Sequence, residues 1–350
     1  MRKWIALGLA ACMTVSSLTG CGSSKKEAET TAAESAAEST AQETGAETDA
    51  AESEAEKSEA AGSDLDKLVF TYVTSPLNVP TIIEKNQEIF EKDFGEMGIS
   101  TEYAEITSGA DQTQALASGD VQVLYAVGAT SVILSAANGA DIKVLNMYSR
   151  SPKAFCMYSK DESLTTPESL KGKTIAGPAG TNLHELLVSY LAQAGMSIDD
   201  VNYVSMSIPD AKAGLDGGSV DAALLAGSVA YNADKQGYHK VTDGEGLIKA
   251  IIAVATTQKF YDEHPEVIAQ LEKSQQEIAD FMKENPDETM SIVAKELDLD
   301  EEAVREMYDY YDFSLNISED DIDGFQKTAD FMLESGMIDE ALDVNSLFIK

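Results

Sequence analysis

Small, hydroxylated or glycine-containing corners are the residues of this sequence best suited to chemistry. Each follows an apolar segment of strand character and precedes a segment of helical period. Unpaired N–H groups at a helix start favour an acidic ligand group, and glycine lets a ligand approach the backbone. We therefore expect a small-molecule site at these corners, with the candidate residues Ser75, Asn78, Ser108, Gly109, Gly128, Thr130, Gly180, Thr181, Asn182 and Ser228.

The corner from Gly177 to Asn182 is the best single candidate. An alternative interpretation is that Asn182 caps its own helix, with Glu185 three residues later, and uses the donors without a ligand. Ser75 and Asn78 have a similar alternative in ordinary turn chemistry around Pro76. Both interpretations stay open at this point.

Arg150 is a further candidate because arginine occurs at only three positions of the sequence. We expect it where the chain passes between two lobes, and a guanidinium there could pair with a carboxylate or sulfonate through two hydrogen bonds. The alternative is a solvent-exposed arginine or a salt bridge between the lobes.

Signals for catalysis, metals or cofactors are weak. The histidines His184, His239 and His264 have no metal-ligand spacing to one another, and Cys156 in an apolar run indicates an inert buried thiol. No nucleophile elbow or phosphate-binding loop is present. We expect no metal, no cofactor and no enzyme activity.

Four tyrosines lie on or beside the predicted strands, namely Tyr72, Tyr125, Tyr148 and Tyr158, and most of them are expected in the core.

The elements that position these corners alternate between strand and helix. Short apolar runs predict strands at 68–73, 99–104, 121–126, 142–147, 154–158, 173–176, 201–204, 221–225 and 248–254. Strand-then-helix repetition predicts mostly parallel sheets with helices on their faces. After the last run the chain is almost wholly helical, with proline at the first turn of two helices.

This order, α/β, then α/β, then α, predicts two lobes. The chain builds one lobe, crosses to a second, and returns to finish the first with helices. We predict lobe 1 at residues 64–150 and 246–350, and lobe 2 at residues 151–245. Roughly 285 residues are enough for two apolar cores on ordinary size scaling.

The N-terminus has the pattern of a lipoprotein signal peptide. Arg2 and Lys3 precede an apolar run too short to span a bilayer, and Leu18-Thr19-Gly20-Cys21 is similar to a lipobox. We predict a signal peptide at residues 1–21 and acylation of Cys21, palmitate being a typical acyl chain. Such anchoring places the protein at the extracytoplasmic face of the cell membrane. The alternative is a plain signal peptide or an unrelated apolar helix.

Residues 22–63 consist mainly of Ala, Glu, Ser and Thr and contain no aromatic residue. Such a composition cannot bury enough apolar surface to offset the entropy of ordering. We predict a disordered acidic tether that reaches roughly 35 Å as a coil. A weakly helical stretch within it is an alternative.

The charge of the chain restricts its partners. With 25 basic and 61 acidic residues the formal net charge is −36, which repels the phosphates of nucleic acids. We expect no nucleic-acid partner and a monomeric protein. The sequence holds no disulfide framework, since its three cysteines are Cys12, Cys21 and Cys156.

Three strings in register carry a family resemblance: Ala115-Leu-Ala-Ser-Gly-Asp-Val121, Leu170-Lys-Gly-Lys-Thr-Ile-Ala176 with Gly180-Thr181, and Leu215-Asp-Gly-Gly-Ser-Val-Asp-Ala222. The chain resembles the nitrate/sulfonate/taurine-type solute-binding proteins of ABC importers, a group that includes proteins similar to the thiamine-pyrimidine synthesis enzyme. The resemblance covers roughly residues 68–256.

The resemblance implies a type II periplasmic-binding-protein fold, in which two α/β lobes close on a ligand. It also implies a membrane permease with a cytoplasmic ATPase as partners. One departure is that Leu224–Val229 lacks the aromatic residue or Glu-Pro pair common there in sulfonate and nitrate binders, which leaves the ligand class open. The alternatives are a secreted enzyme related to thiamine-pyrimidine synthesis, with His184 as its one candidate, or a module that senses its ligand.

Overall fold

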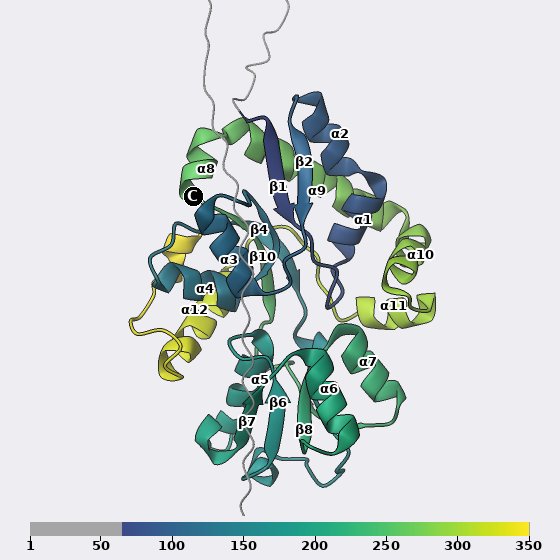
Figure 1. The fold of residues 1–350 in the computed structure, drawn as a ribbon, viewed down its shortest axis with the longest axis vertical. Helices are drawn as coiled ribbons and strands as arrows, with labels where there is room; N and C mark the ends of the chain where they lie inside the picture. The colour runs from purple at the N-terminus through teal and green to yellow at the C-terminus, as the bar shows by residue number, and fades with distance from the viewer. Residues whose placement is uncertain (1–64, 350) are drawn as a thin grey trace, which may run out of the picture. The chain divides into compact units, whose positions relative to one another are not determined.

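The computed structural model describes residues 65–349, which form three β-sheets with helices packed against them (Figure 1). The signal peptide, Cys21, the tether and the boundary at residue 64 lie outside the described residues. The mixed α/β fold class expected from the sequence is confirmed.

Two of the sheets are built from β1 (Lys67–Thr71), β2 (Ser100–Ala104), β3 (Leu124–Gly128), β4 (Lys143–Arg150) and β10 (Ile251–Thr256). β1 and β2 pair in parallel, while β10 lies between β3 and β4 and is antiparallel to both. A hydrogen bond of 3.1 Å from the amide of Thr71 to the carbonyl of Val123 connects the two sheets.

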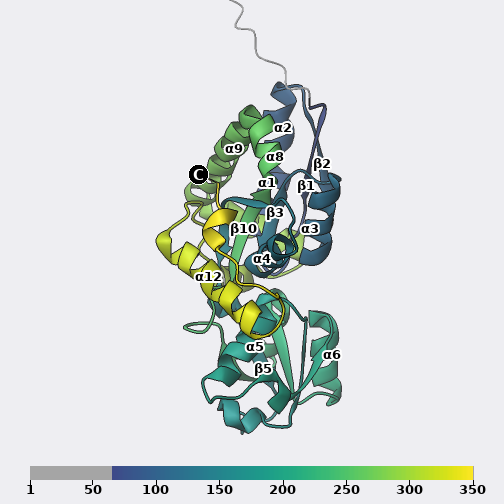
Figure 2. The same cartoon turned by 90° about the vertical axis from the view of Figure 1, so that its left-hand side faces the viewer.

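The helices that accompany these two sheets come from both ends of the described chain. The N-terminal ones are α1 (Val79–Gln87), α2 (Ile89–Glu96), α3 (Gly109–Ser118) and α4 (Ala129–Ala137). The C-terminal ones are α8 (Gln258–Glu263), α9 (Pro265–Glu284), α10 (Pro286–Leu297), α11 (Glu301–Tyr308) and α12 (Glu319–Glu334). Figure 2 shows α12 reaching from the side of α4 toward α5, which places the C-terminal helix beside both groups of elements.

The third sheet has five strands in the order β7-β6-β8-β5-β9. They are β5 (Phe155–Ser159), β6 (Thr174–Gly177), β7 (Asn202–Ser205), β8 (Ala222–Ala226) and β9 (His239–Asp243), with the helices α5 (Asn182–Ala192), α6 (Ile208–Gly217) and α7 (Gly227–Lys235). Short 3₁₀ turns are η1 (Pro152–Ala154), η2 (Pro167–Leu170), η3 (Ile198–Asp200) and η4 (Val344–Leu347).

The strand pairing differs from the mostly parallel sheets that we expected. β5 is antiparallel to β8 and β9, and β10 is antiparallel to both neighbours, while β6 pairs in parallel with β7 and β8. The reason is that β5 and β10 follow directly on chain crossings between the sheets. Neither strand is joined to its sheet neighbours by the strand-helix-strand connection that produces parallel pairs.

The chain crosses between the sheets at two adjacent points. Arg150, the last residue of β4, pairs with Ile251 at the start of β10, and the amide of Ser151 donates to the carbonyl of Ala250. Ala250 has φ of +48°, a conformation that costs a non-glycine residue about 1–2 kcal/mol. The two passages are therefore held side by side. The predicted lobe boundaries at 150/151 and 245/246 stay a prediction.

Aromatic packing holds the α1–α2 side of the first sheet. Phe70 on β1 stacks on Phe90 with ring centroids 4.4 Å apart, and Phe94 packs against both rings. All three side chains are fully buried. Burial of each phenylalanine contributes about 1.5–3 kcal/mol, which fixes the strand whose C-terminal end carries the first corner.

Candidate functional site

The structure places each of the five expected corners between a strand and a helix. Residues 72–78 join β1 to α1, 105–108 join β2 to α3, and 178–181 join β6 to α5. β3 passes directly into α4 at Gly128, and β8 passes directly into α7 at Ala226. Since β1 and β2 belong to one sheet and β6 belongs to another, a site that includes all of these corners requires contacts between the sheets.

One such contact joins the first corner to the last. Gly227, at the start of α7, has φ of +57°, and a Cβ at this position would overlap the carbonyl of Pro76. Glycine is required for both reasons: it tolerates the left-handed conformation, and it leaves room for the neighbouring backbone. The corner after β8 therefore lies against the corner after β1.

The elements also meet at a pocket of ≈ 490 Å³, which is lined by α3, α4 and the corner before α5. Ser108 and Gly180, which lie far apart in the sequence, both line it, together with Ser131 of α4. None of the residues that line this pocket carries a formal charge. An anion bound here would therefore be held by hydroxyl and N–H donors. We call it the corner pocket.

The helix starts at these corners differ in whether a side chain caps them. Ser108 caps α3 by accepting from the amide of Asp111, and Thr181 caps α5 by accepting from the amide of Leu183. α4 and α7 begin without a side-chain cap, at Gly128 and Ala226. Their first-turn N–H groups are thus available to an acceptor from outside the helix.

Two buried polar side chains at these corners have no hydrogen-bond partner within residues 65–349. Thr130, in the first turn of α4, is 2% exposed, and Asn182, the first residue of α5, is 5% exposed. Their polar atoms are not among the fully enclosed ones, so a ligand can reach them. Asn182 is not the helix cap that the alternative interpretation assumed, because Thr181 has that role. Thr130 and Asn182 are consequently the strongest candidates for ligand contact.

Asn78 and Thr181 serve the shape of their own corners. The side-chain amide of Asn78 donates to the carbonyls of Val73 and Ser75 at 2.8 and 3.2 Å. The hydroxyl of Thr181 donates to the carbonyl of Pro178 at 2.9 Å. These bonds match the turn-chemistry alternative. Ser75 is exposed, Ser228 is half-buried, and Gly109 packs against the side chain of Ser131.

Arg150 lies at the chain crossing and not on the corner pocket. Its guanidinium binds Asp321 of α12 through two hydrogen bonds of 2.7 Å and also donates to the carbonyls of Ser314 and Asn316. Burial alone would raise the pKa of Asp321, but hydrogen bonds from Arg150 and Ser318 outweigh it and hold the pKa below its ordinary value. Most of the donors of Arg150 are thus used within the chain, as in the salt-bridge alternative.

His184, the one candidate for catalysis, packs along its helix. Its ring stacks on Tyr203 at 4.9 Å with an interplanar angle of 2°, and its Nδ1 accepts from the amide of Gly180 at 3.3 Å. Burial lowers the pKa of this imidazole. The His184 ring is therefore packed against Tyr203 and hydrogen-bonded to the backbone of the corner.

Cys156 is buried as expected, and burial raises its pKa to about 12, which keeps the thiol protonated.

Three hydroxyls near the site were missed by sequence reasoning. Ser131 lines the corner pocket, while Ser149 and Ser151 at the chain crossing are buried with hydroxyls that have no partner in the described part of the chain. Ser149 occurs inside a strand and Ser151 directly after one, and nothing in their local sequence distinguishes them. The helical period of α4 would have placed Ser131 beside Gly128, three residues earlier, and is the one usable signal.

Metal and membrane features were also searched. Within residues 65–349, no group of three His, Cys, Asp or Glu side chains is placed to hold a metal ion. Over the same residues, no helix is both long and apolar enough to span a bilayer.

Comparison with known proteins agrees with this architecture. The family model described as NMT1/THI5 like matches residues 92–289. The chain is 28% identical over 274 residues, 77% of this chain and 82% of the other, to a protein of Bacillus subtilis (strain 168) named "Putative aliphatic sulfonates-binding protein".

Solved structures share the periplasmic-binding-protein fold that was expected from the sequence, and this expectation is thereby confirmed. The alkanesulfonate-binding protein SsuA from Xanthomonas axonopodis pv. citri, bound to MOPS, superposes with a TM-score of 0.73 at 20% identity, over 81% of this chain and 98% of that one. The desulfurization enzyme DSZB superposes with a TM-score of 0.61 at 15% identity, over 81% and 96%. The fold is therefore compatible with binding and with catalysis. On the match of its family model, this chain belongs to the NMT1/THI5-like family.

Proposed function

We propose that this protein is an extracytoplasmic solute-binding lipoprotein of an ABC importer, and that its ligand is a small organic anion of the sulfonate type. The observation that carries the proposal is the corner pocket, a neutral cavity lined by Ser108, Ser131 and Gly180 from elements of separate sheets. A ligand that bridges two sheets binds their closed arrangement better than an open one, which is the differential affinity that closure requires. The names of the related proteins support the ligand class.

The proposed binding residues keep the sequence candidates at the corners and add Ser131. The hydroxyls of Ser108 and Ser131 line the pocket and supply donors. Thr130 and Asn182 do not line it and are proposed as further contacts from the adjoining first turns of α4 and α5. Gly180, which lines the pocket and has open space beside its Cα, lets the ligand approach the backbone, whereas the space beside Gly109 is filled by Ser131. The proposed site lies between lobe 1, at residues 64–150 and 246–350, and lobe 2, at residues 151–245.

A binding role fits the side chains better than catalysis. His184 is packed against Tyr203, and Cys156 is a buried thiol of raised pKa. The thiol of Cys156 stays protonated, and Nδ1 of His184 already accepts from the Gly180 amide, so neither group favours the catalytic alternative. We therefore propose a monomeric binding protein without cofactor, in place of the secreted-enzyme alternative.

The binding test is a calorimetric titration of the purified protein with taurine and with short alkanesulfonates. We expect micromolar dissociation constants, equivalent to about −8 kcal/mol. Ala179→Trp adds bulk to an exposed residue that lines the corner pocket and should abolish binding. The matched control is Ala192→Trp at the exposed end of α5, which should bind like the wild type. Equal binding by both variants would exclude this pocket.

Anchoring and transport need their own tests. Cys21→Ala should move the protein from the membrane fraction to the soluble fraction, because the acylated residue is lost. Deletion of the gene should abolish uptake of the radiolabelled ligand, and the wild-type gene should restore it. A deletion strain that imports normally but no longer responds to the ligand would indicate the sensing alternative.

A further inference from the structure

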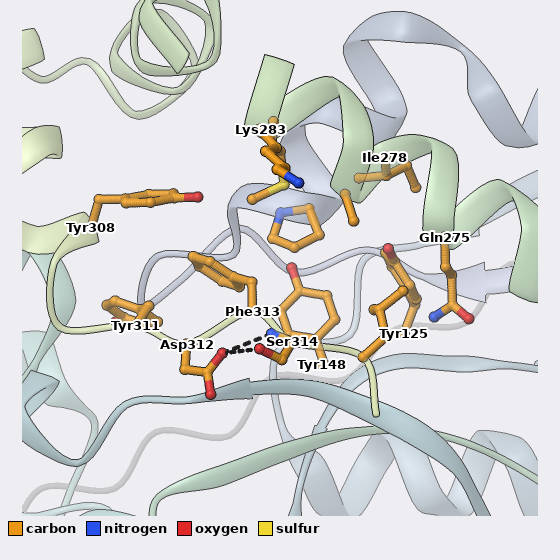
Figure 3. Close-up of a pocket in the computed structure, with 14 residues that line it drawn as sticks. Tyr125, Tyr148, Gln275, Ile278, Lys283, Tyr308, Tyr311, Asp312, Phe313 and Ser314 are labelled. Carbon is orange, nitrogen blue, oxygen red and sulfur yellow. Dashed lines mark hydrogen bonds between the residues drawn. The ribbon is translucent and has the colours of Figure 1, made fainter. Parts of the chain in front are cut away.

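A second pocket lies apart from the corners, between α9, the strands β3 and β4, and the segment that leads into α12 (Figure 3). Its volume is ≈ 350 Å³, within the range of small-molecule sites. None of the sequence candidates for ligand contact lines it. We call it the aromatic pocket.

Aromatic rings form the walls of this pocket. Tyr125 and Tyr148 meet edge to face with centroids 5.2 Å apart, and Tyr148 meets Phe313 in the same way at 6.4 Å. Phe313 in turn stacks on Tyr311 at 5.5 Å with an interplanar angle of 9°. Rings held by one another in this way present fixed apolar surfaces, which suit a flat apolar ligand body.

Tyr125 lines the pocket, and its hydroxyl has no hydrogen-bond partner within residues 65–349. The side chain is 2% exposed. The neighbouring Tyr148 shows the usual arrangement, because its hydroxyl lies 2.8 Å from that of Thr81 and accepts from the Thr81 amide. Buried tyrosine hydroxyls normally find a partner. Burial raises the pKa of Tyr125, so its hydroxyl stays protonated and able to donate.

Lys283 supplies the positive charge of the pocket. It comes from the last turn of α9, and Figure 3 shows its side chain directed toward the rings. Its ammonium has no ion-pair partner among residues 65–349, although this protein is rich in carboxylates. The nearby Asp312 is already engaged, since it accepts two hydrogen bonds from Ser314 and lies 4.0 Å from Arg150.

We propose that the aromatic pocket is a second ligand site, which takes a small monoanion with an aromatic ring. Lys283 and the hydroxyl of Tyr125 bind its anionic group, and the rings of Tyr148 and Phe313 pack against its body. A ligand here also contacts the segment 312–315, which holds Arg150 at the chain crossing.

The test is a calorimetric titration of the full chain with benzoate as the probe. Lys283→Met removes the charge, and Tyr125→Phe removes one hydroxyl from a ring that otherwise stays in place. Each should weaken benzoate binding about tenfold, the loss expected for one hydrogen bond to a charged group. The matched control is Lys273→Met, which removes the same charge from an exposed position of the same helix. It should bind benzoate like the wild type.

Three results would overturn the proposal. They are the absence of benzoate binding up to about 1 mM, equal weakening by Lys273→Met, and unchanged binding by both Lys283→Met and Tyr125→Phe. Circular dichroism and melting temperature establish that each variant is folded, and the surface variant Lys283→Met decides the matter if Tyr125→Phe does not fold. Ala179→Trp tests the corner pocket separately, so failure of one site is distinguishable from failure of the other.

Discussion

The carboxylate of Glu185 on α5 accepts a hydrogen bond of 2.8 Å from the hydroxyl of Thr328 on α12. Both side chains are buried, and the bond connects the elements of the five-stranded sheet to the C-terminal helix. Burial is the larger effect on this carboxyl and raises its pKa from 4.5 to about 7, against the lowering effect of the hydrogen bond. The protein therefore has a junction between its sheets that titrates near neutral pH.

The first prediction concerns the pH dependence of stability. Between pH 4.5 and about 7 the folded state keeps the proton of Glu185 while the unfolded state has lost it. The contribution to stability is thus complete below pH 4.5 and is lost as the pH rises through about 7. The contribution of this proton to the free energy of unfolding is about 3 kcal/mol, since one pKa unit corresponds to about 1.4 kcal/mol. Urea unfolding from pH 4 to 8 should show this decline in the wild type.

Glu185→Gln is the variant that isolates this effect, because the amide is neutral at every pH and has nearly the same shape. The difference in unfolding free energy between variant and wild type should grow as the pH rises. Glu277→Gln on the exposed face of α9 serves as the control and should show no such trend. Parallel pH curves for wild type and Glu185→Gln would contradict the prediction.

The second prediction concerns the contact between Gly227 and Pro76. Gly227→Ala should destabilise the protein by about 2 kcal/mol or more, since a Cβ strains the left-handed backbone and also meets the carbonyl of Pro76. Gly217→Ala, in a helix and with nothing within 4 Å of the added carbon, should be neutral or slightly stabilising. Thermal unfolding compares the two. Similar melting temperatures for both variants would show that the two corners do not touch.

The third prediction separates ligand contact from structural support at the corners. Thr130→Val removes a hydroxyl that has no partner within residues 65–349, so stability should stay near that of the wild type while affinity for the bound sulfonate falls about tenfold. Asn78→Leu should instead lower stability, because two hydrogen bonds to the corner backbone are lost. Calorimetric titration and thermal unfolding of the same samples measure both quantities. Unchanged affinity in Thr130→Val would remove this residue from the site.

The fourth prediction concerns Arg150 and Asp321. Arg150→Lys should cost about 2–4 kcal/mol of unfolding free energy, because an ammonium cannot form the two parallel bonds and leaves a buried carboxylate underpaired. Lys67→Met breaks the exposed pair with Glu102 and should cost less than about 1 kcal/mol. Urea unfolding at neutral pH gives both values. A double-mutant cycle with Asp321→Asn should return most of the loss as coupling energy.

The sequence predicted the local features of this protein well. Alternating strand and helix patterns placed the corners at 74–78, 108–109 and 177–182, and the buried thiol of Cys156 followed from its apolar neighbours. Such features depend on residues close together in the chain, through capping, periodicity and turn chemistry. The mixed α/β class followed from the strand-helix repeat as well, and the periplasmic-binding-protein fold followed from the family resemblance.

Contacts between distant residues were decided by the tertiary structure alone. Three of them are Gly227 against Pro76, the shared pocket of Ser108 and Gly180, and Glu185 with Thr328. The antiparallel insertion of β10 belongs with them, as does the pairing of Arg150 with Asp321 rather than with a ligand. The physical reason is that local pattern sets the conformation of each segment, while the register and burial that bring two segments together depend on packing across the whole core.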